Sequence, residues 1–302
     1  MGLCAALVRP ISGEEHHEAR GRWFSVSFRS VDERNAALAL QRAERTCEVV
    51  CADLALPEVP TIRLVLAGSA EEFARLTQQR LPRWAAGATI SQEGGPIIYL
   101  PSPRWGVGGA DFETTVVHEV AHALVAVATN FEPLPRWLTE GLAIHYSREQ
   151  QWTSPSQVSR ALLTNSLLSL EEIEHLNSYP EQKARLAYQE SFLAVQYLLR
   201  HYGLDALRTL LTALGQGEDV DAAFARALGK DSWEFEQEWI KDVRRRHRWT
   251  FLADADWYLW VFILLLAVGA FLAARARARR TVRAWTEDEM HNATDQSLWE
   301  KH

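Results

Sequence analysis

Cysteine is scarce in this sequence. Only three cysteines occur among 302 residues, so they cannot all pair within one chain, and no disulfide framework defines the fold. Cys47 and Cys51 lie one helical turn apart in an amphipathic segment. We interpret them as small buried apolar residues rather than as a metal-binding pair, and Cys4 is assigned no role.

Low-complexity tracts, internal repeats and long basic stripes are also missing. The composition, 47% hydrophobic and 24% charged residues, is that of a globular protein. A net charge of -7 without a basic stripe argues against a nucleic-acid partner. A chain of this length can bury a substantial core in one or two domains.

A complete signal peptide is absent from the chain as given. Residues 1–21 start with an apolar stretch, MGLCAALVRPISG, that is too short and lacks a basic leader. We interpret this stretch as the possible remnant of an export segment whose true start lies upstream. The polar residues 14–21 are expected to be loose.

The pattern of the main part predicts an α/β half followed by a helical half. Alternating β-rich segments predict strands at 23–28, 61–67 and 97–100. Helical spacing predicts a helix over 31–54, and Ser69 with Glu72 forms a capping box for a second helix. The predicted domain covers 22–250 and divides into an α/β part, a middle part with two helices and a helical part, at 22–110, 111–150 and 151–250.

The segment His118-Glu119-Val120-Ala121-His122 is an HExxH motif. Asp111 is a good N-cap for a helix that runs to about Asn130. Two histidines four residues apart project from one face of a helix and can share one Zn²⁺. Glu119 lies on the adjoining face, which suits a general base that is not itself a ligand. The alternative is a helix whose histidines only make hydrogen bonds.

Glu140 is the third expected ligand. A catalytic zinc site needs three protein ligands and one open position. Seventeen residues separate His122 from Glu140, which fits a helix end, a proline turn and a returning helix. The surrounding stretch WLTEGLAIHY is apolar, and an unpaired buried carboxylate there would be costly unless it binds a cation.

With these motifs the sequence resembles the gluzincin zinc metallopeptidases, and most closely the bacterial peptidase-MA-like proteins. HEVAH followed by LPRWLTEGLA carries the resemblance, which extends from about Trp23 to Val243. It implies an α+β, thermolysin-like catalytic domain in which a small sheet packs on the HExxH helix and a helical subdomain follows. It also implies His118, His122 and Glu140 as zinc ligands and Glu119 as the base.

Two departures from this family limit what the resemblance implies. The Gly-Met-Glu-Asn signature of the aminopeptidase branch is absent, which favours an endopeptidase. Ile144 stands where thermolysin-like enzymes often carry an acidic residue that orients a histidine. That support is expected from elsewhere, such as a backbone carbonyl.

An oxyanion-stabilising group is expected from the helical half. Tyr188 is the first candidate, followed by Tyr197, His145 and Tyr146, although each also suits a packed or surface aromatic. The strand 97–100 is a candidate edge strand for an extended substrate, with sheet core as the alternative.

Residues 257–274, WYLWVFILLLAVGAFLAA, contain no charge. Such a length just spans the hydrocarbon core of a bilayer, and it is flanked by aromatic residues on one side and arginines on the other. We predict a transmembrane helix, with a buried core helix as the alternative, and a tail over 275–302.

These patterns predict a membrane-anchored zinc metallopeptidase that hydrolyses a peptide or protein. The expected location is the bacterial cell membrane, with the catalytic domain outside the cytoplasm. The alternative location is a tail-anchored enzyme that faces the cytoplasm. The alternative functions are an inactive peptidase-like binding module and a zinc hydrolase of a non-peptide substrate.

Overall fold

The computed structural model describes residues 16–78, 86–92, 95–105, 111–149, 156–247 and 259–279. The chain divides into two compact units, Met1–Arg248 and Trp249–His302. Residues 1–15 of the predicted N-terminal segment 1–21, which include the proposed export remnant, lie outside the described residues, as do residues 280–302 of the tail.

The first unit contains a five-stranded sheet with the strand order β1-β2-β3-β5-β4. The strands are β1 (His16–Arg20), β2 (Phe24–Arg29), β3 (Ile62–Ala67), β4 (Ala88–Gln92) and β5 (Gly95–Pro101). The three middle strands β2, β3 and β5 run parallel, and each outer strand pairs antiparallel with its neighbour. The strands predicted at 23–28, 61–67 and 97–100 are confirmed.

The two outer strands correct the sequence-based predictions. Residues 14–21 are not loose throughout, because His16–Arg20 pair with β2 as a polar edge strand. The candidate edge strand at 97–100 is wrong: β5 lies between β3 and β4 and is almost entirely buried. Its continuous apolar run suits an interior strand. The short polar strand β4 forms the edge beyond it.

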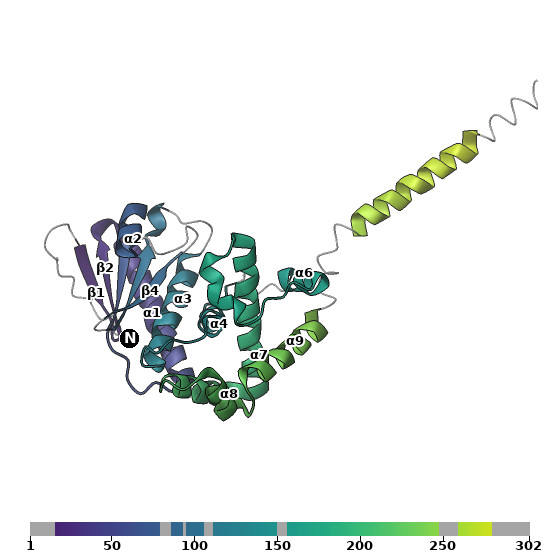
Figure 1. Ribbon diagram of the computed structural model, residues 1–302. Coiled ribbons are helices and arrows are strands. Elements are labelled where there is room, and N and C mark those ends of the chain that lie inside the picture. The colour runs from purple at the N-terminus through teal and green to yellow at the C-terminus, as the bar shows by residue number, and fades with distance from the viewer. Residues whose placement is uncertain are drawn as a thin grey trace, which may run out of the picture. The chain divides into compact units, whose positions relative to one another are not determined.

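Helices cover both faces of this sheet (Figure 1). On one face, α1 (Glu33–Leu54) and α3 (Phe112–Ala128) pack on the strands and share the main hydrophobic core with them. On the other, α2 (Ala70–Leu76) covers a smaller cluster that includes Phe73, Ile97 and Tyr99. Cys47 is buried in the main core and Cys51 packs against it, in agreement with the interpretation of both as apolar residues.

The helical half follows α3. Its elements are α4 (Arg136–Ser147), α6 (Ser156–Thr164), a 3-10 segment at Glu172–Ser178, α7 (Glu181–Leu214), α8 (Val220–Leu228) and α9 (Ser232–His247). Pro180 and Gly215 flank α7. At Gly203 the helix is kinked, where φ is 78° and glycine has no Cβ to clash. The α+β fold class is confirmed.

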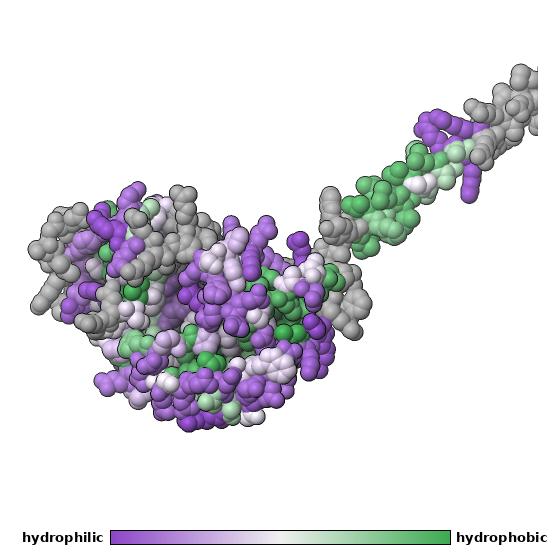
Figure 2. Space-filling model, in the orientation of Figure 1, coloured by the Kyte–Doolittle hydropathy of each residue, from purple (hydrophilic) through white to green (hydrophobic). Residues whose placement is uncertain are grey.

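The second unit contains one described helix, Leu259–Arg279. It is 21 residues long and apolar enough to cross a membrane, and none of its apolar window is buried. Figure 2 shows a mainly hydrophobic surface along it. At 1.5 Å per residue its length is about 32 Å, which matches the hydrocarbon core of a bilayer. The exposure argues against the alternative of a buried core helix.

Candidate metal centre

Helix α3 places the two motif histidines on one face. Asp111 caps it, since its side chain accepts a hydrogen bond from the backbone N–H of Thr114 at 3.3 Å. The apolar sequence around the motif buries α3 between α1, the sheet and α4. The rings of His118 and His122 lie edge to face, and their Nε2 atoms are 3.0 Å apart.

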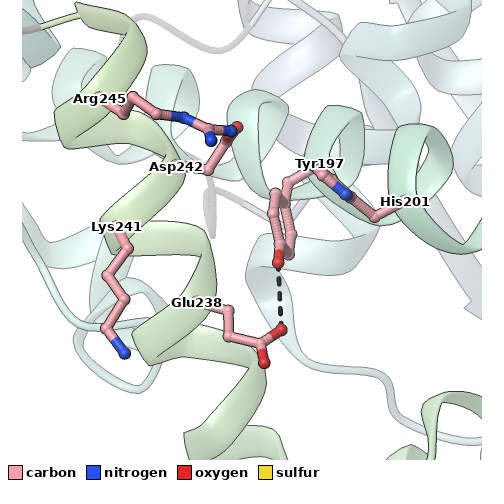
Figure 3. Close-up of a pocket in the computed structure, with 6 residues that line it drawn as sticks. All are labelled: Tyr197, His201, Glu238, Lys241, Asp242 and Arg245. Carbon is pink, nitrogen blue, oxygen red and sulfur yellow. Dashed lines mark hydrogen bonds and ion pairs between the residues drawn. The ribbon is translucent and has the colours of Figure 1, made fainter.

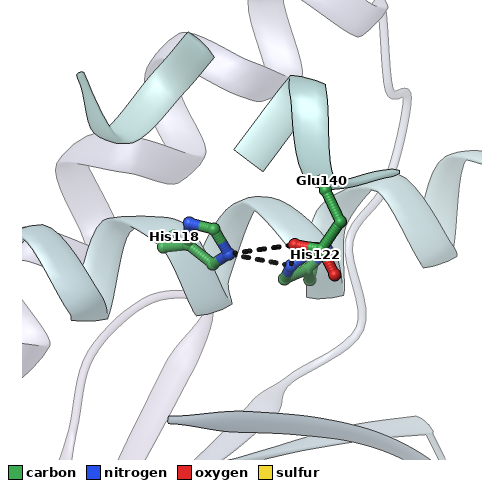
Figure 4. A group of neighbouring side chains, drawn as sticks. All are labelled: His118, His122 and Glu140. Carbon is green, nitrogen blue, oxygen red and sulfur yellow. Dashed lines mark hydrogen bonds and ion pairs between the residues drawn. The ribbon is translucent and has the colours of Figure 1, made fainter. Parts of the chain in front are cut away.

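Helix α4 brings Glu140 back to this face. The chain turns after α3 through Asn130 and Phe131, both with positive φ, and Pro135 stands at the N-cap of α4. This is the predicted proline turn and returning helix. Figure 4 shows the Glu140 carboxylate pointing toward the two imidazoles. Its Oε2 atom lies 3.5 Å from Nε2 of His118 and 3.4 Å from Nε2 of His122.

The close packing of α4 on α7 positions Glu140. A Cβ on the next residue, Gly141, would lie 2.3 Å from the backbone carbonyl oxygen of Ser191 in α7. Only glycine allows the two backbones to approach this closely. The TEGLA sequence therefore combines a candidate ligand with the residue that lets its helix dock.

The three side chains fit a metal ion. One ligand atom from each of His118, His122 and Glu140 lies within 4.8 Å of the others. Glu140 Oε2 is buried and forms no hydrogen bond, which is costly unless a cation compensates. Two imidazoles and one carboxylate are the donor set of one class of catalytic zinc site, which leaves a position open.

The electrostatics of this group also favour a cation. Burial acts to lower the pKa of His118, but the Glu149 and Glu140 carboxylates outweigh it and hold the pKa well above its ordinary value. Burial acts to raise the pKa of Glu140, yet His122, His118 and Arg136 hold it well below its usual range. Positive charge is thus stabilised at His118 and negative charge at Glu140.

Glu149 supplies the support that was expected from elsewhere in the chain. Its Oε1 atom lies 2.7 Å from Nδ1 of His118. Nδ1 of His118 forms no hydrogen bond of good geometry, so this contact is an ion pair, and a carboxylate on this side of the ring favours a proton on Nδ1 and leaves Nε2 free to bind a metal. Glu149 lies just beyond the end of α4. This carboxylate is therefore farther along the sequence from Glu140 than Ile144, where thermolysin-like enzymes often carry the acidic residue. A backbone carbonyl is not needed to orient His118.

Arg136 contacts Glu140 from the other side. Its Nη2 atom lies 3.1 Å from Oε1 of Glu140, one helical turn away in α4, and it also donates to Asn177 at 3.0 Å. This contact engages the carboxylate oxygen that faces away from the histidines. The sequence carries an i, i+4 Arg–Glu pair here, which is the signal that could have identified it.

Glu119 is held beside the sheet edge. Its side chain is buried in α3, and its Oε2 atom accepts a hydrogen bond of 2.7 Å from the hydroxyl of Thr89 in β4. Because β4 is not among the strands that the sequence predicts, Thr89 was missed. The alternating Ala-Thr-Ile of its strand was the available signal.

Tyr188 lies in the electrostatic field of the same group. It is buried in α7, and burial raises its pKa well above the ordinary value, with a further contribution from the Glu140 carboxylate. Glu119 and Glu149 act in the same direction. Tyr188 therefore keeps its phenolic proton at neutral pH and remains a hydrogen-bond donor.

The other aromatic candidates have different partners. Tyr197 donates to Glu238 at 3.1 Å, in a separate cavity of about 260 Å³ between α7 and α9 (Figure 3). His145 pairs with Gln196 through Nδ1 at 2.8 Å, and burial together with Asp53 raises the pKa of Tyr146. None of the three predicted metal ligands lines that cavity, and Tyr188 remains the candidate donor.

The chain was compared with solved structures and with curated proteins. Two solved structures of a mutant M1 zinc metallopeptidase from Deinococcus radiodurans, one bound to a Tyr-Ser-Ala substrate, are similar to the chain, at 15% identity and a TM-score of 0.36. The alignments cover 78% of this chain, which spans about half the length of those proteins, 51% and 50%. No curated protein matches significantly.

The sequence profile of the Peptidase MA superfamily matches residues 82–245. This segment is more than half of the chain, and it contains the HExxH motif, Glu140 and Tyr188. The match confirms the resemblance to peptidase-MA-like gluzincins and supports a zinc peptidase. The chain belongs to the Peptidase MA superfamily.

Proposed function

We propose that the chain is a membrane-anchored zinc peptidase in which His118, His122 and Glu140 bind the metal and Glu119 is the general base. One observation carries this proposal: three ligand atoms from two helices converge within 4.8 Å inside the segment that matches the family. Glu119 is buried in the same helix as the two histidines. It is not one of the three ligands, so its carboxylate is available as the base.

The residues around the metal group have distinct tasks. Bound zinc would polarise the substrate carbonyl and lower the pKa of a water molecule. Glu119 accepts a proton from the attacking water and delivers it to the leaving amine, and Glu149 holds His118 in the metal-binding tautomer. The Tyr188 hydroxyl donates to the oxygen on which negative charge develops.

A peptide substrate fits the position of β4. This strand lies at the edge of the sheet and pairs only with β5 among the described residues. Its free edge offers backbone hydrogen bonds to an extended peptide, and Thr89 in the same strand contacts Glu119. We propose an endopeptidase, because the signature that anchors a free amino terminus in the aminopeptidase branch is absent from the sequence.

The helix Leu259–Arg279 is the proposed membrane anchor. Its apolar window is exposed along its whole length, and exposed apolar surface of this extent marks a membrane or protein contact. Tryptophans and a tyrosine precede its apolar stretch and arginines follow it, which is typical of the two interfaces of a bilayer. The proposed location is a bacterial cell membrane.

Metal analysis combined with peptide cleavage tests this function. The full chain purified in detergent should carry close to one zinc per molecule and cleave a peptide library until a chelator is added. The double variant His118→Ala, His122→Ala should lose the zinc. Glu119→Gln should keep the zinc and lose about 10²- to 10⁴-fold in rate, since it removes a base and not a ligand.

Each alternative gives a different result in this experiment. Zinc without peptide cleavage would identify a binding module or a hydrolase of a non-peptide substrate, and screening ester and amide substrates would separate the two. Equal zinc content in the wild type and in the double histidine variant would overturn the proposed metal site.

A further inference from the structure

We propose that Thr89 is the positioning residue of the general base, and that its hydroxyl holds one carboxylate oxygen of Glu119 so that the other is directed to the attacking water. The inference rests on the proposed function, because it assigns a partner to the proposed base. It connects the edge strand of the sheet directly to the catalytic helix.

The hydroxyl of Thr89 lies close to two oxygen atoms of Glu119. The Oγ1 atom is 2.7 Å from the carboxylate oxygen Oε2 and 2.9 Å from the backbone carbonyl oxygen of the same residue. A hydroxyl has only one proton to donate, so it serves one acceptor at a time. The distances allow either bond without movement of the backbone.

The carboxylate oxygen is the stronger acceptor of the two. A hydrogen bond to a charged group is shorter and about twice as strong as one between neutral groups. Thr89 therefore holds Oε2, which leaves Oε1 as the oxygen that takes the proton from water.

Gly87, the residue just before the edge strand, also confines Glu119. A Cβ on this residue would lie 2.7 Å from Cγ and 2.9 Å from Oε1 of Glu119. The backbone of Gly87 therefore packs against the side chain of the base, next to Oε1, while Thr89 binds Oε2. Gly87 and Thr89 thus limit the orientations that the carboxylate can adopt.

The position of Thr89 argues against a purely structural role for its contact with Glu119. Thr89 is half-buried and reaches a side chain 30 positions away in the sequence. The neighbouring residues Ala88 and Ile90 pack on the opposite face of the sheet, in the small cluster under α2. Because side chains alternate along a strand, Thr89 lies on the face that packs against α3. Its hydroxyl contacts Glu119 on that face.

The variants Thr89→Val and Thr89→Ser separate the effect of the hydroxyl from the effect of the side-chain shape. Valine keeps the volume but loses the donor, so kcat should fall about 10- to 100-fold. KM, zinc content and melting temperature should stay near the wild-type values. Serine keeps the donor and should retain most of kcat. The full chain in detergent is used throughout, with a fluorogenic peptide found by the library screen.

Thr115→Val is the matched control. Thr115 is a buried threonine in the same helix as Glu119, but its hydroxyl donates to the backbone carbonyl of Asp111 at 3.2 Å. This control should keep its kcat. Gly87→Ala is a second test of the same idea: it displaces Glu119 by contact, so kcat should fall while zinc stays bound.

A binding measurement reports on the position of Glu119 without requiring catalytic turnover. A peptide hydroxamate that binds the zinc also needs the carboxylate as an acceptor for its hydroxyl. We expect Thr89→Val to weaken its Kd about 10-fold, measured by calorimetry on the zinc-loaded protein, and Thr89→Ser to keep it. In a Glu119→Gln background, Thr89→Val should cause little further loss in kcat, because the two residues act together.

Equal kcat and equal hydroxamate affinity for Thr89→Val and wild type would overturn the positioning role. So would a full additional loss from Thr89→Val in the Glu119→Gln background. A wild-type protein that binds zinc but shows no chelator-sensitive cleavage would instead overturn the proposed function, and the hydroxamate measurement on this zinc-loaded protein would still report on Thr89.

Discussion

Tyr188 combines burial with a neighbouring negative charge, and both raise the pKa of its phenol. It therefore stays a donor over the whole pH range in which the enzyme is expected to act. We predict that Tyr188→Phe lowers kcat by about 10²- to 10³-fold, as the loss of one oxyanion donor does. Zinc content and melting temperature should change little, because only one oxygen atom is removed.

Steady-state kinetics and metal analysis of this variant check the prediction. Tyr197→Phe is the matched control, since the Tyr197 hydroxyl contacts Glu238 in the separate cavity. The control should keep its kcat. If Tyr188→Phe were as active as wild type, the oxyanion donor would have to be another group.

At the residue scale, the sequence alone predicts the site residues whose role shows in their own local segment. The spacing of His118 and His122 places both on one helical face whatever the rest of the chain does. Glu140 was identifiable because a charge in an apolar helix needs a partner. Thr89 and Glu149 were missed, because each is an ordinary polar residue until tertiary packing brings it to Glu119 or His118.

At the scale of the elements, the docking of α4 on α7 controls the position of Glu140. Inside a helix, alanine is usually more stabilising than glycine by about 1 kcal/mol. At Gly141 we predict the opposite, because the added Cβ would lie 2.3 Å from the Ser191 carbonyl oxygen of α7 and 2.6 Å from Val195 Cγ2. Gly141→Ala should destabilise the fold by about 1–3 kcal/mol and weaken zinc binding.

Thermal unfolding and zinc titration of this variant provide the measurement. Val195→Ala, alone and combined with Gly141→Ala, is the control: it removes the contact with the side chain and leaves the contact with the Ser191 backbone. We expect the combination to recover little of the lost stability. Full recovery would show that the two backbones do not limit the approach of the helices.

Elements with a strong periodic pattern were predictable, and the polar edge strands were not. The buried strands β2, β3 and β5 and the capped helix α3 follow from their apolar patterns and from Asp111. The outer strands β1 and β4 are short and polar, so any alternation in them, such as Ala-Thr-Ile in β4, is too brief to mark a strand clearly. Edge strands often have this character, since it discourages pairing with other chains. The edge of the sheet that is proposed to bind the substrate was thus the part with the weakest pattern.

At the scale of the whole molecule, the orientation of the proposed anchor decides which compartment the peptidase unit faces. Five basic residues lie within about 16 residues before the apolar stretch 257–274, and five follow it. The first group is Lys241, Arg244, Arg245, Arg246 and Arg248, and the second is Arg275, Arg277, Arg279, Arg280 and Arg283. The positive-inside count is therefore a tie.

The first group is also partly engaged within the peptidase unit. Asp242, a buried carboxylate in α9, forms ion pairs with Arg245 and Arg246 at 2.9 Å and 2.8 Å. The second group directly follows the apolar stretch, whereas Asp254 and Asp256 lie beside its other end. Basic residues close to a span have the greater weight in setting orientation. We therefore predict that the tail faces the cytoplasm and the peptidase unit lies outside.

Protease protection in spheroplasts of a bacterial host tests this orientation. One tag is placed at residue 22 and one after His302, and protease is added before and after the membrane is permeabilised. We expect the tag at residue 22 to be digested in intact spheroplasts and the C-terminal tag to survive until permeabilisation. The reverse pattern would mean that the enzyme is tail-anchored and faces the cytoplasm, and its substrates would then have to be sought among cytoplasmic proteins.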